Sequence, residues 1–184
     1  MRWKAFFILI NLCCFYNYNI AQTYIPVEKS SSVLFYLNNF GIRTEGSFSG
    51  IKGDINFNPT KLSEASFDMS VKAETIFTKN RARDSHLKSR DYFYTEKFPT
   101  IYLISKLITK DPQSDQYIFE GELIIKDLTR AIKFPFRVEQ EKSGYRFKAD
   151  FKINRRDYFI GSSSLVLSNN VEVFLSIATN KKIY

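Results

Sequence analysis

The chain has 184 residues, of which 44% are hydrophobic and 16% aromatic, so it fits one domain with enough apolar material for a core. This composition excludes a disordered or low-complexity chain. The single histidine, His86, excludes a zinc site built from several imidazoles and leaves one candidate for histidine-based acid–base chemistry.

Residues 1–21 are typical of a secretory signal peptide. Arg2 and Lys4 form a short basic start, and residues 5–15 are nearly all apolar but too short for a comfortable membrane span. Cleavage after this segment removes both cysteines and lowers the formal net charge from +8 to +6, because Arg2 and Lys4 are lost. An uncleaved anchor and a lipidated cysteine are the alternatives. We expect a periplasmic or secreted domain, residues 22–184, without disulfide bonds.

Beyond residue 30, apolar and polar residues alternate, the pattern of strands with one buried face. Residues 101–108 are apolar at both odd and even positions, that is, on both faces of a strand, which predicts a strand covered on both sides. Phe48 and Ile55 have opposite parity, which predicts a bulge near Gly50 and Gly53. We predict strands at 24–29 with 32–40, 43–57, 62–73, 100–109, 116–126, 130–140, 145–155 and 170–180.

Short turn signals such as Asp111-Pro112 and Ser143-Gly144 separate the predicted strands, which indicates an antiparallel meander. Eight such strands close naturally into a barrel whose interior is filled or holds one small ligand. Residues 78–90 lack the alternation and predict a short helix or structured loop over one mouth, with Thr78 as its N-cap. We therefore predict an all-β fold, a single eight-stranded antiparallel barrel.

One segment, 83–93 (RDSHLKSRDYF), is followed by Lys97-Phe98-Pro99 and resembles the central motif of the YceI family. Shorter motifs at 46–48 (GSF), 121–129 (GELIIKDLT) and 155–161 (RRDYFIG) resemble other family motifs in the same order. The resemblance implies an exported bacterial protein with a lipocalin-like barrel that binds polyisoprenoid lipids. Phe159 stands where the family usually has a small residue, which predicts a bulkier loop and a narrower mouth.

Many aromatic rings of the predicted strands share the inward parity. The resemblance supplies a ligand class for them, a polyisoprenoid or isoprenoid quinone, and no other cofactor is expected. Apolar rings suit a long hydrocarbon because its burial is nondirectional. The alternative is that the rings simply fill the barrel of a structural or stress protein without a lipid ligand. The candidate cavity-lining residues are Phe35, Phe48, Phe67, Met69, Phe119, Phe134, Phe136, Phe147 and Phe151.

The segment 78–93 supplies a second candidate set, at the mouth. His86 is either a contact for a lipid head group or, as we prefer, a hydrogen-bonding brace to Asp84, Ser89 or Asp91. The mouth candidates are Arg83, Asp84, His86, Leu87, Asp91 and Phe93.

The basic side chains at the mouth have two interpretations. They either contact anionic phospholipid head groups, in a transient membrane encounter, or a prenyl phosphate at the barrel mouth, or they form a solvated surface. The same alternatives hold for Arg155 and Arg156, whereas Asp157-Tyr158 is interpreted as a turn brace. The basic cluster comprises Arg81, Arg83, Lys88 and Arg90.

Three other classes fit less well. A hydrolase using His86 lacks a G-x-S-x-G, H-E-x-x-H or P-loop motif. A transmembrane barrel would turn Arg146 and Lys148 toward lipid, and a nucleic-acid-binding barrel is at odds with export. We therefore expect a non-enzymatic protein that binds, carries or sequesters an isoprenoid-type lipid or quinone, with no metal and no nucleic acid.

Overall fold

The computed structural model describes residues 22–183, so the expected signal peptide lies outside the described residues. Within that range one sheet is accompanied by the helix α1 (Arg81–Lys88) and three short 3₁₀ helices, η1 (Glu28–Ser30), η2 (Leu62–Glu64) and η3 (Arg155–Tyr158). The strands are β1 (Thr23–Pro26), β2 (Ser32–Asn39), β3 (Ile42–Asn56), β4 (Ser66–Phe77), β5 (Thr100–Lys110), β6 (Tyr117–Ile125), β7 (Leu128–Gln140), β8 (Tyr145–Asn154) and β9 (Asn170–Lys181).

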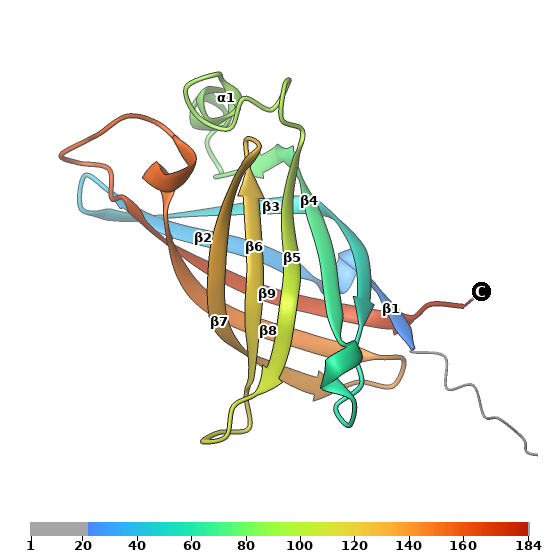
Figure 1. Ribbon diagram of the computed structural model, residues 1–184. Coiled ribbons are helices and arrows are strands. Elements are labelled where there is room, and N and C mark those ends of the chain that lie inside the picture. The colour runs from blue at the N-terminus through green and yellow to red at the C-terminus, as the bar shows by residue number, and fades with distance from the viewer. Residues whose placement is uncertain (1–21, 184) are drawn as a thin grey trace, which may run out of the picture.

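The strands close into a barrel in which each neighbour runs antiparallel (Figure 1). Strands β2 to β9 follow one another around the barrel, and pairing of β2 with β9 completes it. The short β1 also pairs with β3 and β9, so it continues the position of β2 beyond η1. The predicted eight-stranded antiparallel barrel is therefore confirmed.

The long strand β3 bends where its glycines lie. Its register with β4 shifts between Ser47 and Lys52, and Gly50 and Gly53 have φ values of 72° and 140°, which suit a residue without Cβ. The Glu28 carboxylate accepts hydrogen bonds from the backbone N–H groups of Gly50 and Ile51, at 2.9 and 2.7 Å. The predicted bulge is confirmed, and Glu28 satisfies backbone groups that the bulge frees.

Strand β5 is not covered on both sides, so that prediction was wrong. Tyr102 and Leu107 are 41% and 47% exposed on its outer face. The register with β6 shifts between Ser105 and Leu107, which returns Ile108 to the buried side. A bulge therefore accounts for the apolar residues at both parities.

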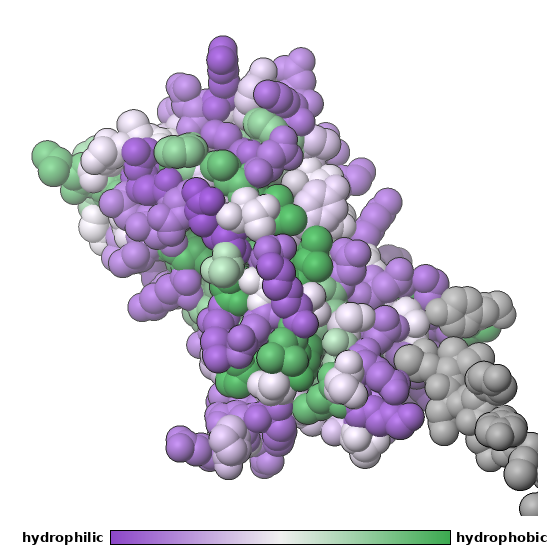
Figure 2. Space-filling view, in the orientation of Figure 1, coloured by the Kyte–Doolittle hydropathy of each residue, from purple (hydrophilic) through white to green (hydrophobic). Residues whose placement is uncertain are grey.

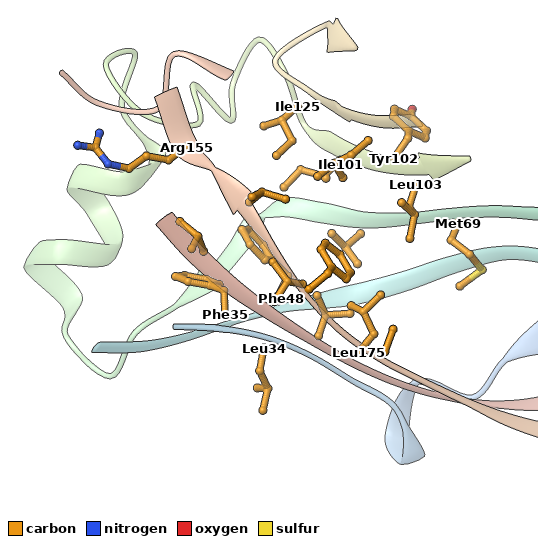
Figure 3. A pocket seen from close by; sticks show the side chains of 18 of the residues that line it. Leu34, Phe35, Phe48, Met69, Ile101, Tyr102, Leu103, Ile125, Arg155 and Leu175 are labelled. Atoms are coloured by element: carbon orange, nitrogen blue, oxygen red, sulfur yellow. The ribbon is translucent and has the colours of Figure 1, made fainter. Parts of the chain in front are cut away.

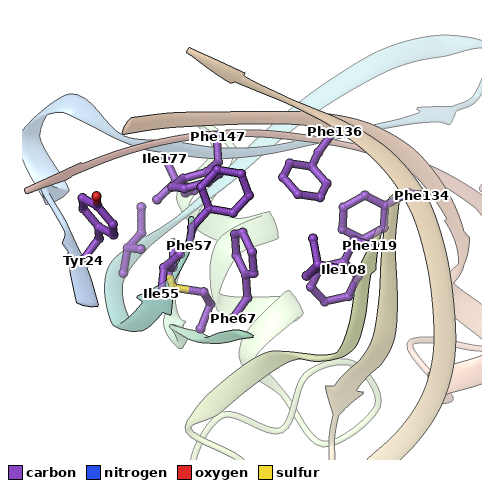
Figure 4. Close-up of a cluster of buried hydrophobic side chains, with 12 residues drawn as sticks. Tyr24, Ile55, Phe57, Phe67, Ile108, Phe119, Phe134, Phe136, Phe147 and Ile177 are labelled. Atoms are coloured by element: carbon purple, nitrogen blue, oxygen red, sulfur yellow. The ribbon is translucent and has the colours of Figure 1, made fainter. Parts of the chain in front are cut away.

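Buried side chains form two clusters at opposite ends of the barrel. The closed-end cluster, away from α1, contains most of the buried rings (Figure 4). Phe67 makes edge contacts with Phe136 and Phe147, whose ring centroids are 5.5 and 5.1 Å away, a favourable aromatic geometry. The mouth-end cluster, beneath α1, comprises Ala73, Ile76, Phe93, Ile101, Leu123, Ile125, Tyr158 and Ile160.

Candidate functional site: the barrel cavity

A cavity of about 220 Å³ lies inside the barrel. Side chains from β2 to β9 and from α1 line it, and the surface that they present to the cavity is almost entirely apolar (Figure 3). Met69 and Arg155 lie at opposite ends of the lining, with Arg155 near α1. The arrangement suits an apolar ligand, because few hydrogen-bonding or charged groups face the cavity to orient a polar ligand.

All nine predicted lining residues lie against this cavity, but they divide into two groups. Phe35, Phe48 and Phe151 remain partly exposed to the hollow. The stacked rings of Phe119, Phe134 and Phe151 join the groups, with centroid distances of 4.7 and 4.2 Å. Rings thus fill one part of the barrel and surround a hollow in the other. The buried group consists of Phe67, Met69, Phe119, Phe134, Phe136 and Phe147.

Sequence reasoning missed most of the aliphatic part of the lining. Val33, Leu37, Val173 and Leu175 point to the cavity from β2 and β9, yet they are only partly buried. Their inward parity was visible in the sequence. The alternation along a strand shows that a side chain points inward, but it does not show whether that side chain packs against a neighbour or borders empty space. The inward side chains that border empty space mark the open part of the cavity.

Gly46 explains the motif at residues 46–48. It pairs with Phe35 across β2 and β3, and the Phe35 ring occupies the space that a Cβ of residue 46 would need. Glycine therefore allows the Phe35 ring to lie flat against the backbone of β3, where it meets Phe48 at a centroid distance of 5.5 Å. A side chain at this position would push the ring toward the cavity.

Asp84 is the brace of the mouth segment. Its buried carboxylate accepts hydrogen bonds from the backbone N–H and the hydroxyl group of Thr78, at 2.8 and 2.5 Å. Arg83 donates to the hydroxyl and the carbonyl oxygens of Thr78, at 2.7 Å each. Thr78 is therefore not the N-cap that the sequence predicted. Asn80 caps α1, because its side chain accepts a hydrogen bond from the backbone N–H of Arg83 at 3.0 Å.

His86 does not act as the predicted hydrogen-bonding brace. Its side chain is exposed, and within residues 22–183 it makes no hydrogen bond to Asp84, Ser89 or Asp91. Its ring packs edge-on against Tyr92 at a centroid distance of 4.7 Å. His86 also lies outside the cavity lining, as do Asp84 and Asp91, whereas Arg83, Leu87 and Phe93 contribute to it.

Arg155 is neither solvated nor free to hold a head group, contrary to both interpretations of the sequence. It is 2% exposed, and its guanidinium donates hydrogen bonds to the carbonyl oxygens of Ile160, Ser162 and Ser168 at 2.6, 3.0 and 3.0 Å. Burial lowers the pKa of Arg155 from its usual value. The side chain fixes the connection between β8 and β9, which a residue pattern alone could not reveal.

Phe159 does not narrow the mouth, so that expectation was also wrong. It is 61% exposed and lies outside the cavity lining. Its φ of 49° is left-handed, which explains why a small residue would be favoured there. The neighbouring Tyr158 is buried in the mouth-end cluster, and burial raises its pKa to about 12.

Within residues 22–183, no group of three or more His, Cys, Asp or Glu side chains is placed to hold a metal ion. No helix in that range is long and apolar enough to cross a membrane.

A family model described as the YceI-like domain matches residues 24–179. The chain belongs to this family. A UPF0312 protein of Photorhabdus laumondii is 27% identical over 138 residues, which cover 72% of this chain and 71% of that protein. Protein YceI of Escherichia coli O157:H7 is 23% identical over the same length and the same shares of the two chains.

Solved structures share the fold of this YceI-like chain. BcnA of Burkholderia cenocepacia superposes with a TM-score of 0.78 at 18% identity and covers 83% of this chain and 98% of its own. A polyisoprenoid-binding domain of Saccharophagus degradans gives a TM-score of 0.66 at 12% identity and covers 86% and 98%. At these identities, the similarity establishes the architecture.

Proposed function

We propose that this YceI-like protein binds one long apolar lipid of the isoprenoid or isoprenoid-quinone class and carries or sequesters it without chemical change. The observation that carries the proposal is the apolar hollow bordered by Phe35, Phe48 and Phe151, closed at its far end by packed rings. The name of the Saccharophagus relative, a polyisoprenoid-binding domain, supports the ligand class.

The free energy of burial favours a flexible hydrocarbon as the ligand. Each CH₂ group removed from water contributes about 0.8 kcal/mol, but a large ligand realises only about 0.3 kcal/mol per heavy atom. A chain of about forty carbons would then bind with at most about 12 kcal/mol. Shape and burial, rather than particular polar contacts, would select the ligand.

Export completes the proposal. The basic and apolar start of the sequence supports delivery to the periplasm or the medium, where a water-insoluble lipid needs a carrier. No catalytic step is proposed. The hydrolase alternative gains no support from His86, whose exposed ring contacts Tyr92.

Native mass spectrometry of the protein purified from its own host tests the proposal directly. The expected spectrum contains a species heavier by the mass of one lipid, lost on organic extraction and regained with a prenyl lipid. Val173→Phe adds a ring at the partly exposed cavity wall of β9 and should reduce uptake by about tenfold. Thr129→Phe adds the same ring outside the barrel and should not. A delipidated wild-type protein that takes up no prenyl lipid would refute the proposal.

A further inference from the structure

Exposed apolar side chains project from two connections that lie side by side at the mouth. The β2–β3 hairpin presents Phe40 and Ile42, and the β8–β9 connection presents Leu165 and Val166. The backbone N–H of Phe40 donates to the carbonyl oxygen of Val166 at 2.9 Å, which joins the two tips. The hairpin and the connection project together from the barrel in Figure 1, and hydrophobic atoms gather at their tips in Figure 2.

Two exposed phenylalanines at this end occupy backbone conformations that disfavour them. Phe40 and Gly41 form a two-residue turn with φ values of 51° and 76°, a turn that prefers Asn-Gly. Phe159 has a φ of 49°. Burial of the ring does not offset the cost of the left-handed backbone at either residue, since Phe40 is 73% exposed and Phe159 is exposed as well. Residues that break local preferences without a packing gain point to a role in binding.

The tip carrying Leu165 is held in place rather than left loose. Arg155 binds carbonyl oxygens on both sides of this tip, at Ile160, Ser162 and Ser168. The Ser164 hydroxyl group accepts hydrogen bonds from the backbone N–H groups of Val166 and Leu167, at 3.2 and 3.1 Å. The structure therefore presents Leu165 to solvent on an ordered scaffold.

Charge differs sharply between the two ends of the barrel. The connections β4–β5, β6–β7 and β8–β9 at the mouth contain nine Lys and Arg against five Asp and Glu. The connections β3–β4, β5–β6 and β7–β8 at the closed end contain two against four. Arg81, Lys88 and Arg90 are exposed and form no ion pair within the described part of the chain. Apolar tips and unpaired cations at the same end of the barrel match an anionic lipid surface.

We propose that the mouth docks on an anionic lipid bilayer through a docking rim composed of Phe40, Ile42, Phe159 and Leu165. The rim side chains enter the interface, and the cations of α1 and the following loop contact lipid head groups. Leu37, Asn39 and Leu167 line the cavity close to this rim, so docking turns the mouth toward the membrane. Docking itself requires no ligand in the cavity.

Sedimentation with vesicles of phosphatidylcholine and phosphatidylglycerol, mixed about three to one, tests the inference. Wild-type protein should bind, and binding should weaken with added salt and with phosphatidylcholine alone, because head-group attraction is screened or absent. The double variant Phe40→Asn and Leu165→Ser should bind about tenfold more weakly or worse. Asparagine suits the left-handed turn, so the fold should keep its stability.

The control removes two exposed apolar side chains elsewhere, with Leu107→Ser on the barrel wall and Ile183→Ser near the C-terminus. It should bind within about twofold of wild type. Every variant has the same residues 1–21, so the expected cleavage removes that segment from all of them alike. The inference would be overturned if the wild-type protein did not bind, if the rim variant bound as well as wild type, or if the control variant lost as much binding as the rim variant. So would a wild-type dimer that the rim variant converts to monomer without any vesicle binding, because a second copy would then cover the rim.

Discussion

The two ends of this barrel are built from the same strands and the same inward parity, yet packed rings fill the closed end, whereas the mouth end surrounds a hollow beside its buried cluster. On β8, Phe147 is buried among the closed-end rings, whereas Phe151 is only partly buried. On β9, Ile177 is buried, whereas Leu175 is only partly buried. The difference teaches that alternation selects the inside of a barrel, while the size and crossing of facing side chains decide whether that inside is filled.

The largest expected effect separates the two ends by their packing. Phe67→Ala should lower the free energy of unfolding by about 3–5 kcal/mol, because it leaves a void among tightly packed rings. Val173→Ala, at the wall of the existing hollow, should cost only about 1 kcal/mol. Urea denaturation followed by circular dichroism measures both. Equal losses would show that the two ends are packed alike.

A second prediction concerns what holds the mouth segment. Asp84→Ala removes the acceptor of the Thr78 backbone and hydroxyl hydrogen bonds and should cost about 1–3 kcal/mol. Hydrogen exchange should accelerate first in residues 78–88. His86→Ala is the matched control on the same helix and should change stability by less than about 0.5 kcal/mol. If His86→Ala proved the more damaging of the two, the brace would be assigned to the wrong residue.

The smallest expected effect is a pH dependence at the mouth-end cluster. Folding holds Tyr158 protonated up to a pKa of about 12, whereas an unfolded tyrosine ionises near 10. Its contribution to stability is therefore intact below pH about 10 and is lost between about 10 and 12, with about 1 kcal/mol lost near pH 11. Tyr158→Phe should lose less stability than wild type on going from pH about 9 to 11. Tyr102→Phe, on the outer face, should follow wild type, and an identical loss in both variants would contradict the assignment.

The sequence predicted the cavity side of the strands but missed the side chains that hold the mouth in place. Rings at inward parity marked the cavity side of the strands, and all nine lie against it. Their role as ligand contacts stays a prediction. The braces were not foreseen correctly, because Asp84 and Arg155 act through backbone groups of Thr78, Ile160 and Ser162, whose positions depend on loop conformation.

The sequence by itself determined the architecture, because a period of two, short turns and the glycines of β3 depend on local geometry that few folds satisfy. It also determined the family, through the motif at residues 83–93. Only the tertiary structure decided where the interior stays empty and which charged side chain is buried. Void volume and the burial of Arg155 depend on how eight strands and two long connections meet in space, and no single strand carries that information.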